Sequence, residues 1–109
     1  MTNEDFQVSR RDELLAIAKA ILEGEIGVIR GLRLVQSFRF DLADELDPDF
    51  MTFVGVDSDT DHLPVDDERE NWSQEALDRK DVEIAEAEAF HREKVFQACR
   101  HLINRFHIS

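Results

Sequence analysis

The feature that most constrains the fold is residues 73–106, a run without glycine or proline. Glu, Ala, Lys and Arg dominate this run, and all four favour helix. Ser73 is suited to be the N-cap, Glu75 falls in the first turn, and Trp72 can pack against Leu77. The run therefore predicts a helix over 73–106, about 45 Å long at 1.5 Å per residue.

The two halves of this helix carry different apolar patterns. The second half has a dense stripe typical of a core helix: Val95, Phe96, Cys99, Leu102, Ile103 and Phe106. The first half has only a thin stripe amid charged residues: Leu77, Ile84, Ala87 and Phe90. A thin stripe predicts a narrow contact, either with the acidic segment that precedes the helix or with a second copy of the chain in a homodimer.

A second predicted helix spans residues 9–24. Ser9 followed by Asp12 fits a helix N-terminus, because a serine can cap it and an acidic side chain faces the positive end of the helix dipole. Apolar residues then recur at helical spacing up to Gly24, which is suited to end the helix. Residues 1–8 are expected to be flexible.

Residues 27–46 have two interpretations. Their apolar positions recur every three or four residues, as in a helix, but residues 32–42 also alternate as a strand would. The length of the pattern and the few β-branched residues favour a helix. Gly27 and Gly31 lie four positions apart, which fits either a weak first turn or a close approach to the helix before it.

Asp47 and Pro48 form another helix start signal, with aspartate as N-cap and proline at the first helical position. A short helix over 48–54, closed by Gly55, is the expected result. Residues 55–72 then form a long acidic loop, which we expect to be ordered because it has five apolar anchors: Val54, Val56, Leu63, Val65 and Trp72.

These elements predict an all-α fold, a small bundle of three main helices with one short helix and a long ordered acidic loop before the last helix. At 109 residues, the chain is expected to be a single domain over 1–109.

Charge is concentrated in one segment. The net charge is -12, and residues 41–71 hold twelve Asp and Glu against Arg69 alone. A field of this sign repels nucleic-acid and lipid phosphates, so direct nucleic-acid binding and membrane binding are not expected. It attracts a basic protein, and the candidate partner-binding residues are Asp57, Asp59, Asp61, Asp66, Asp67 and Glu68.

The same segment contains a partial calcium-loop pattern. Counted from Asp57, carboxylates occupy the first, third, fifth and twelfth positions of an EF-hand loop, and His62 stands where the turn requires glycine. The candidate ligands of calcium or another divalent cation are Asp57, Asp59, Asp61, His62 and Glu68. The alternative is an Asx-rich loop whose aspartates bond their own backbone, with no cofactor.

No catalytic motif is present, so the chain is predicted not to be an enzyme. Glu88 and His91 have the spacing of half a di-iron site, but no second such pair exists. Cys99 lies in the apolar stripe and is expected to be a buried, inert thiol. A single cysteine and an acidic N-terminus fit a protein of the reducing cytoplasm.

Several short stretches resemble a family of small uncharacterised bacterial proteins to which no activity is attached. They are residues 54–64, Trp72, Ala76-Leu77, Lys80-Asp81, Ala98-Cys99-Arg100 and Leu102-Ile103. The resemblance would cover residues 10–105 and implies a bacterial source. It carries over no functional residue.

The sequence therefore predicts a non-catalytic interaction protein that presents an acidic surface over residues 41–71 to a basic partner. Small acidic helical bacterial proteins include toxin-neutralising proteins, which is an analogy of size and charge. The alternative is a divalent-cation module built on residues 57–68.

Overall fold

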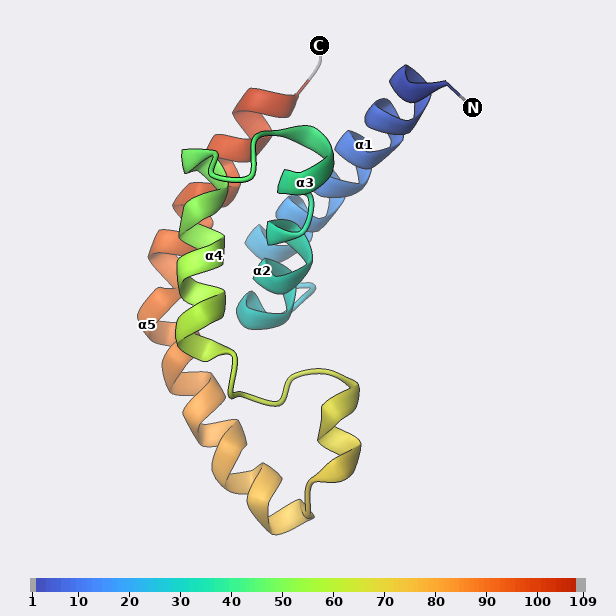
Figure 1. Ribbon diagram of the computed structural model, residues 1–109. Helices are drawn as coiled ribbons and strands as arrows, with labels where there is room; N and C mark the ends of the chain where they lie inside the picture. Colours follow the sequence, from blue (N-terminus) through green and yellow to red (C-terminus); the bar gives the residue numbers. More distant parts are fainter. Residues whose placement is uncertain (1, 108–109) are drawn as a thin grey trace.

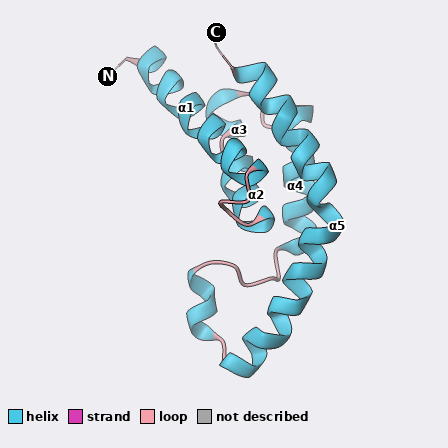
Figure 2. Cartoon of the chain, turned by 180° about the vertical axis from the view of Figure 1, so that it is seen from behind, coloured by secondary structure: helices cyan, strands magenta, loops and turns pink. Residues whose placement is uncertain are grey.

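The computed structural model describes residues 2–107, and the regular elements among them are all helices (Figures 1 and 2). Their bounds are α1 Asn3–Leu22, α2 Val28–Gln36, α3 Arg39–Leu42, α4 Pro48–Thr60, the 3-10 helix η1 Asp67–Asn71 and α5 Gln74–Phe106. The all-α prediction is confirmed. The strand alternative for residues 32–42 is wrong, because they lie in α2, α3 and the turn between them.

Helix α5 spans the whole molecule. Its 33 residues agree with the longest extent of the protein, 48 Å, since a helix rises about 1.5 Å per residue. The Ser73 hydroxyl accepts a hydrogen bond from the Ala76 amide at 3.2 Å, as expected of the N-cap. The prediction of a long helix over 73–106 is confirmed.

The hydrophobic core lies against the second half of α5, where α1, α2 and α4 pack around it (Figure 1). Helices α4 and α5 run side by side in opposite directions. The buried core residues are Leu14, Ala18, Ile21, Val28, Leu32, Val35, Phe38, Phe50, Phe53, Val56, Val95, Ala98, Cys99 and Leu102. The dense pattern on α5 is confirmed, since its buried residues begin at Val95. In the thin stripe Leu77, Ile84 and Ala87 are half-buried, but Phe90 is 82% exposed, so its assignment to this stripe is wrong.

Helix α1 begins earlier than predicted. Thr2 is its N-cap and makes a capping box with Asp5, so the expected start at Ser9 is wrong and residues 3–8 are helical rather than flexible; Met1 lies outside the described residues. At the other end Gly24 has φ +75°, and the Glu25 amide donates to the Ala20 carbonyl at 2.9 Å. This left-handed glycine ends α1 as predicted.

Helix α2 depends on both of its neighbours. Gly27 is its N-cap and has no capping side chain; instead the Glu88 carboxylate of α5 accepts from the Ile29 amide at 3.0 Å. Gly31 lies against Ile21 of α1, and a Cβ at Gly31 would come within 2.6 Å of the Ile21 Cδ1. The predicted close approach to the first helix is confirmed at Gly31, whereas Gly27 faces Glu88.

The predicted helix over 27–46 is divided and shorter. Helix α2 ends at Gln36, a turn at Ser37 and Phe38 follows, and the four-residue α3 ends at Leu42. The Ser37 hydroxyl donates to the Leu34 carbonyl at 2.8 Å, which favours a turn over helix continuation. Ala43 is fully extended, so residues 43–46 are not helical.

Helix α4 starts as predicted but is longer. The Asp47 carboxylate accepts from the Asp49 amide at 3.0 Å, with Pro48 at the first position. The helix then continues through Gly55 to Thr60, because buried side chains recur every three or four residues: Phe50, Phe53, Val56 and Thr60. The expected helix end at Gly55 is therefore wrong, and so is the assignment of residues 55–60 to the acidic loop.

Candidate functional site: the acidic segment

The acidic segment, residues 41–71, is organised around an arginine from another helix. Arg33 of α2 has a side chain only 17% exposed, and it donates to the Thr60 carbonyl at 2.7 Å and to the Leu63 carbonyl at 3.0 Å. Thr60 is the last residue of α4, so its carbonyl has no partner within the helix. The Leu63 amide donates to this carbonyl at 3.0 Å, and Arg33 is a second donor that also places a positive charge at the negative end of the helix dipole.

The same guanidinium group pairs with two carboxylates. It lies 3.4 Å from Asp57 and 3.4 Å from Glu68. Glu68 also accepts from the Val65 amide at 3.3 Å. Backbone amides, first that of Glu68 itself and then that of Val65, together with Arg33 hold the pKa of this carboxyl below its usual range. These contacts fix the loop beyond α4 to α2.

The loop and η1 form an arm, residues 61–73, that leaves the end of α4 and returns to the start of α5 (Figure 1). Arg69 ties the arm to α5 with two hydrogen bonds to Asp81, at 2.7 and 3.1 Å, and bonds the Pro64 carbonyl at 2.9 Å. This bidentate pair lowers the pKa of Asp81 and raises that of Arg69. His62 lies 3.1 Å from Glu83 of α5. The predicted acidic loop over 55–72 is thus reduced to residues 61–72, which include η1 and are held by these contacts.

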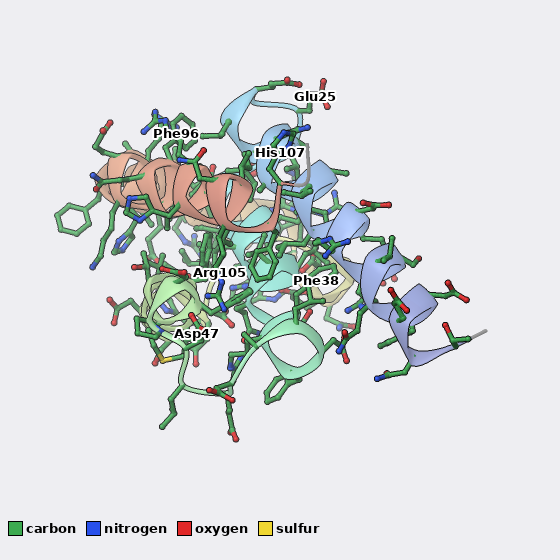
Figure 3. All side chains as sticks on the ribbon, turned by 90° about the horizontal axis from the view of Figure 1, so that it is seen from above. Glu25, Phe38, Asp47, Phe96, Arg105 and His107 are labelled. Carbon is green, nitrogen blue, oxygen red and sulfur yellow. The ribbon has the colours of Figure 1, made fainter. Side chains whose placement is uncertain are left out.

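The other end of the segment is fixed by arginines of α5 and α1. Arg105 donates to Asp47 at 2.8 Å and to Asp49 at 2.9 Å, and Figure 3 shows it pointing from α5 toward the start of α4. The hydrogen bond from Arg105 is the main cause that lowers the pKa of Asp47. Arg10 of α1 donates to Asp41 at 2.9 Å.

The carboxylates of the segment thus fall into two groups. Six form ion pairs with Arg10, Arg30, Arg33 or Arg105: Asp41, Asp47, Asp49, Asp57, Asp66 and Glu68. Within residues 2–107 the other six form no ion pair and are exposed: Asp44, Glu45, Asp59, Asp61, Asp67 and Glu70. Half of the segment's negative charge is therefore used inside the protein, and half faces the solvent.

The six predicted partner-binding residues are divided in the same way. Asp57 and Glu68 meet at Arg33, and Asp66 lies 3.3 Å from Arg30. Asp59, Asp61 and Asp67 are the exposed members without an ion pair in the described chain. The arginines that pair with these residues, Arg30 and Arg33, lie outside the segment and were not predicted to contact it. The one sequence feature that could have indicated them is the spacing of Arg30 and Arg33, three positions apart on the same helix.

The five predicted cation ligands are not brought together. Asp57 and Asp59 lie in the last turn of α4, so an EF-hand loop cannot begin there. Asp57 and Glu68 converge on Arg33 instead of on a cation site, and His62 pairs with Glu83. Across residues 2–107 the structure has no group of three His, Cys, Asp or Glu side chains arranged to hold a metal ion.

The remaining candidate residues have structural roles. Glu88 caps α2, and His91 packs edge-on against the Phe90 ring at 4.9 Å. Cys99 is buried as predicted, and burial raises the pKa of its thiol to about 12, which supports the expectation of an inert thiol. Between α4 and α5 lies a half-open pocket of 240 Å³, lined by Pro48, Asp49, Thr52, Lys94, Gln97, Ala98 and His101.

None of the helices in the described part of the chain combines the length and apolar character needed to cross a bilayer. Comparisons of the chain with protein-family models, with curated proteins and with solved structures gave no match.

Proposed function

We propose that this chain is a non-catalytic interaction protein that presents the exposed carboxylates of the acidic segment to a basic protein partner. One observation carries the proposal: the structure neutralises six of the twelve carboxylates with its own arginines and leaves six exposed without an ion pair among residues 2–107. The internal pairs fix the backbone, and the exposed charges remain for a partner.

The strongest part of this surface is at the end of α4 and on the arm, where Asp59, Asp61, Asp67 and Glu70 are exposed. Arg33 and Arg69 hold the arm in place, so its charges are presented on a fixed backbone. A preorganised charged surface accelerates association with a partner of opposite sign and loses little entropy on binding.

A basic protein fits this surface better than the other classes of partner. Phosphates of nucleic acids and acidic lipids carry the same sign as the segment. A second copy of the chain also carries a net charge of -12, which opposes a homodimer. Toxin neutralisation in the cytoplasm of a bacterium is the biological role that we propose for such a protein.

Titration with an oligolysine peptide tests the proposal. The variant Asp59→Asn, Asp61→Asn, Asp67→Asn, Glu70→Gln removes four exposed charges of the surface. Its matched control makes the same change in net charge with four exposed acids elsewhere: Glu4→Gln, Asp12→Asn, Glu23→Gln and Glu25→Gln. Calorimetry at low and at physiological salt measures the affinity of each.

We expect the surface variant to bind oligolysine about tenfold more weakly than the control, a difference of ~1.4 kcal/mol. Wild-type affinity should fall steeply with salt, since exposed charges are screened within about 8 Å at physiological ionic strength. Equal losses in the two variants, or an affinity indifferent to salt, would show that the segment is not the binding surface.

A further inference from the structure

Two large apolar side chains stand exposed at one corner of the acidic segment. This corner, residues 39–46 and named here the α3 corner, comprises α3 and the bend and turn that follow it. Phe40 is 61% exposed and Leu46 is 78% exposed. Side chains of this size are normally placed in a core, as the fully buried Phe50 and Phe53 of α4 are.

The exposure is built into the fold, because the backbone of the corner is held on both sides. Arg39 donates to the Gln36 carbonyl at 2.9 Å and to the Glu45 carbonyl at 3.1 Å, and its guanidinium carbon lies 4.1 Å from the centre of the Phe40 ring. This one side chain therefore links the Phe40 ring to the backbone next to Leu46.

Contacts on either side of Arg39 fix the corner to the rest of the protein. Arg10 bonds Asp41 at 2.9 Å, and Arg105 bonds Asp47, the residue after the corner, at 2.8 Å. A corner held in this way presents its apolar side chains without an ordering cost on binding.

The charge around these apolar side chains indicates what covers them. Asp44 and Glu45 lie between Phe40 and Leu46 in the chain, are exposed and form no ion pair within residues 2–107. These two carboxylates outnumber the one cation beside the apolar side chains, Arg39, which lies over the Phe40 ring. An apolar surface next to free carboxylates complements apolar side chains flanked by lysine or arginine. A second copy of this chain would bring the same carboxylates into contact, and like charges across an interface are unfavourable.

We infer that the α3 corner is the apolar anchor site for the basic partner, and that the partner segment it binds is amphipathic, with apolar side chains beside basic ones. The inference rests on the proposed function and adds the recognition of apolar groups to it. Phe40 and Leu46 act as the anchors, and Asp44 and Glu45 select basic neighbours.

Two peptides and two double variants test it. The first peptide is an amphipathic helix of leucine and lysine, about fourteen residues or four turns long; the second has serine in place of each leucine. The test variant is Phe40→Ser, Leu46→Ser. The control variant is Val82→Ser, Phe90→Ser, which removes two apolar side chains of α5 that are 60% and 82% exposed. Calorimetry measures the affinity of wild type and of each double variant for each of the two peptides.

We expect the test variant to bind the leucine–lysine peptide at least about tenfold more weakly than wild type, or ~1.4 kcal/mol. The control variant should bind it as wild type does. Both variants should bind the serine–lysine peptide with unchanged affinity. If the double variant fails to fold, the single variant Leu46→Ser takes its place, because the Leu46 side chain makes no hydrogen bond. We expect Leu46→Ser also to bind the leucine–lysine peptide more weakly than wild type.

The results separate the two proposals. Unchanged binding of the leucine–lysine peptide by the test variant, or an equal loss in the control, would overturn the anchor site; salt-dependent binding of the serine–lysine peptide would then still support the acidic surface. If wild type binds neither peptide, both proposals are overturned.

Discussion

Replacing Arg33 by methionine is expected to release the arm from the body of the protein. Methionine keeps much of the apolar stem of arginine but removes every donor. The Thr60 and Leu63 carbonyls lose their hydrogen bonds, and Asp57 and Glu68 lose their common positive partner. The Thr60 carbonyl then keeps only the Leu63 amide as a donor, at 3.0 Å.

The size of the effect follows from these contacts. A hydrogen bond from a charged donor contributes about 1.5–3 kcal/mol, so the two to carbonyls together give about 3 kcal/mol at the low end. The ion pairs to Asp57 and Glu68 are long, at 3.4 Å, and partly exposed, and each adds less than about 1 kcal/mol. If the loss reaches the whole fold, the melting temperature falls by about 12 °C or more.

Hydrogen exchange and the fluorescence of Trp72, the single tryptophan of the chain, report on the arm directly. We expect the Leu63 and Arg69 amides to exchange faster in Arg33→Met than in wild type. The Leu63 amide donates to the Thr60 carbonyl at the start of the arm, and the Arg69 amide donates to the Asp66 carbonyl within it. The matched control is Arg30→Met, on the same helix and with the same change in charge; its side chain is 62% exposed and makes one pair, at 3.3 Å. Equal protection of the arm in the two variants would refute the central role of Arg33.

Five further outcomes are expected. Gly31→Ala should lower the free energy of unfolding in urea by about 1–3 kcal/mol, because the new methyl overlaps the α1 side chain that it faces. Gly55→Ala, where a Cβ meets no atom within 4 Å, should raise it by roughly 0.5–1 kcal/mol. The hydrogen bond from Arg105 lowers the pKa of Asp47 in the folded protein. Asp47 therefore contributes its full stabilisation above its pKa in the unfolded chain, and this stabilisation is lost as the pH falls through its pKa in the folded protein. Acid titration of Arg105→Gln should accordingly show a shallower loss of stability than wild type below about pH 4. The Cys99 thiol, with its pKa raised to about 12, should resist thiol reagents in native protein and react once urea unfolds it. Millimolar calcium after chelator treatment should leave the melting temperature unchanged, and a clear rise would revive the cation site.

The parts of the fold that could be predicted are those where local signals agree. Ser73, the absence of glycine and proline, and the apolar stripe all predict α5, and Asp47 with Pro48 predicts the start of α4. The start of α1 was missed although Thr2 and Asp5 form a capping box, because the first turns are exposed and have no apolar stripe.

Where tertiary packing decides, the local signal was misleading. Gly55 costs a helix about 1 kcal/mol, which the burial of Val56 on the next position outweighs, so α4 continues past it. In the same way, composition shows how many carboxylates the acidic segment has but not which of them are neutralised. That depends on Arg33 and Arg105, which reach the segment only when the chain is folded.

The cap that Glu88 places on α2 has a consequence for the order of events during synthesis. The carboxylate and the Ile29 amide that it bonds are 59 residues apart, and α2 has nine residues, fewer than the roughly twelve that an isolated helix needs even to be marginally stable. Translation delivers α2 several seconds before Glu88, at roughly 5–20 residues per second. Arg33 lies on this helix, so the acidic surface can fold only after α5 has been synthesised. A nascent chain that ends before Glu88 therefore carries the negative charge of the segment without the folded surface that would present it to a basic partner.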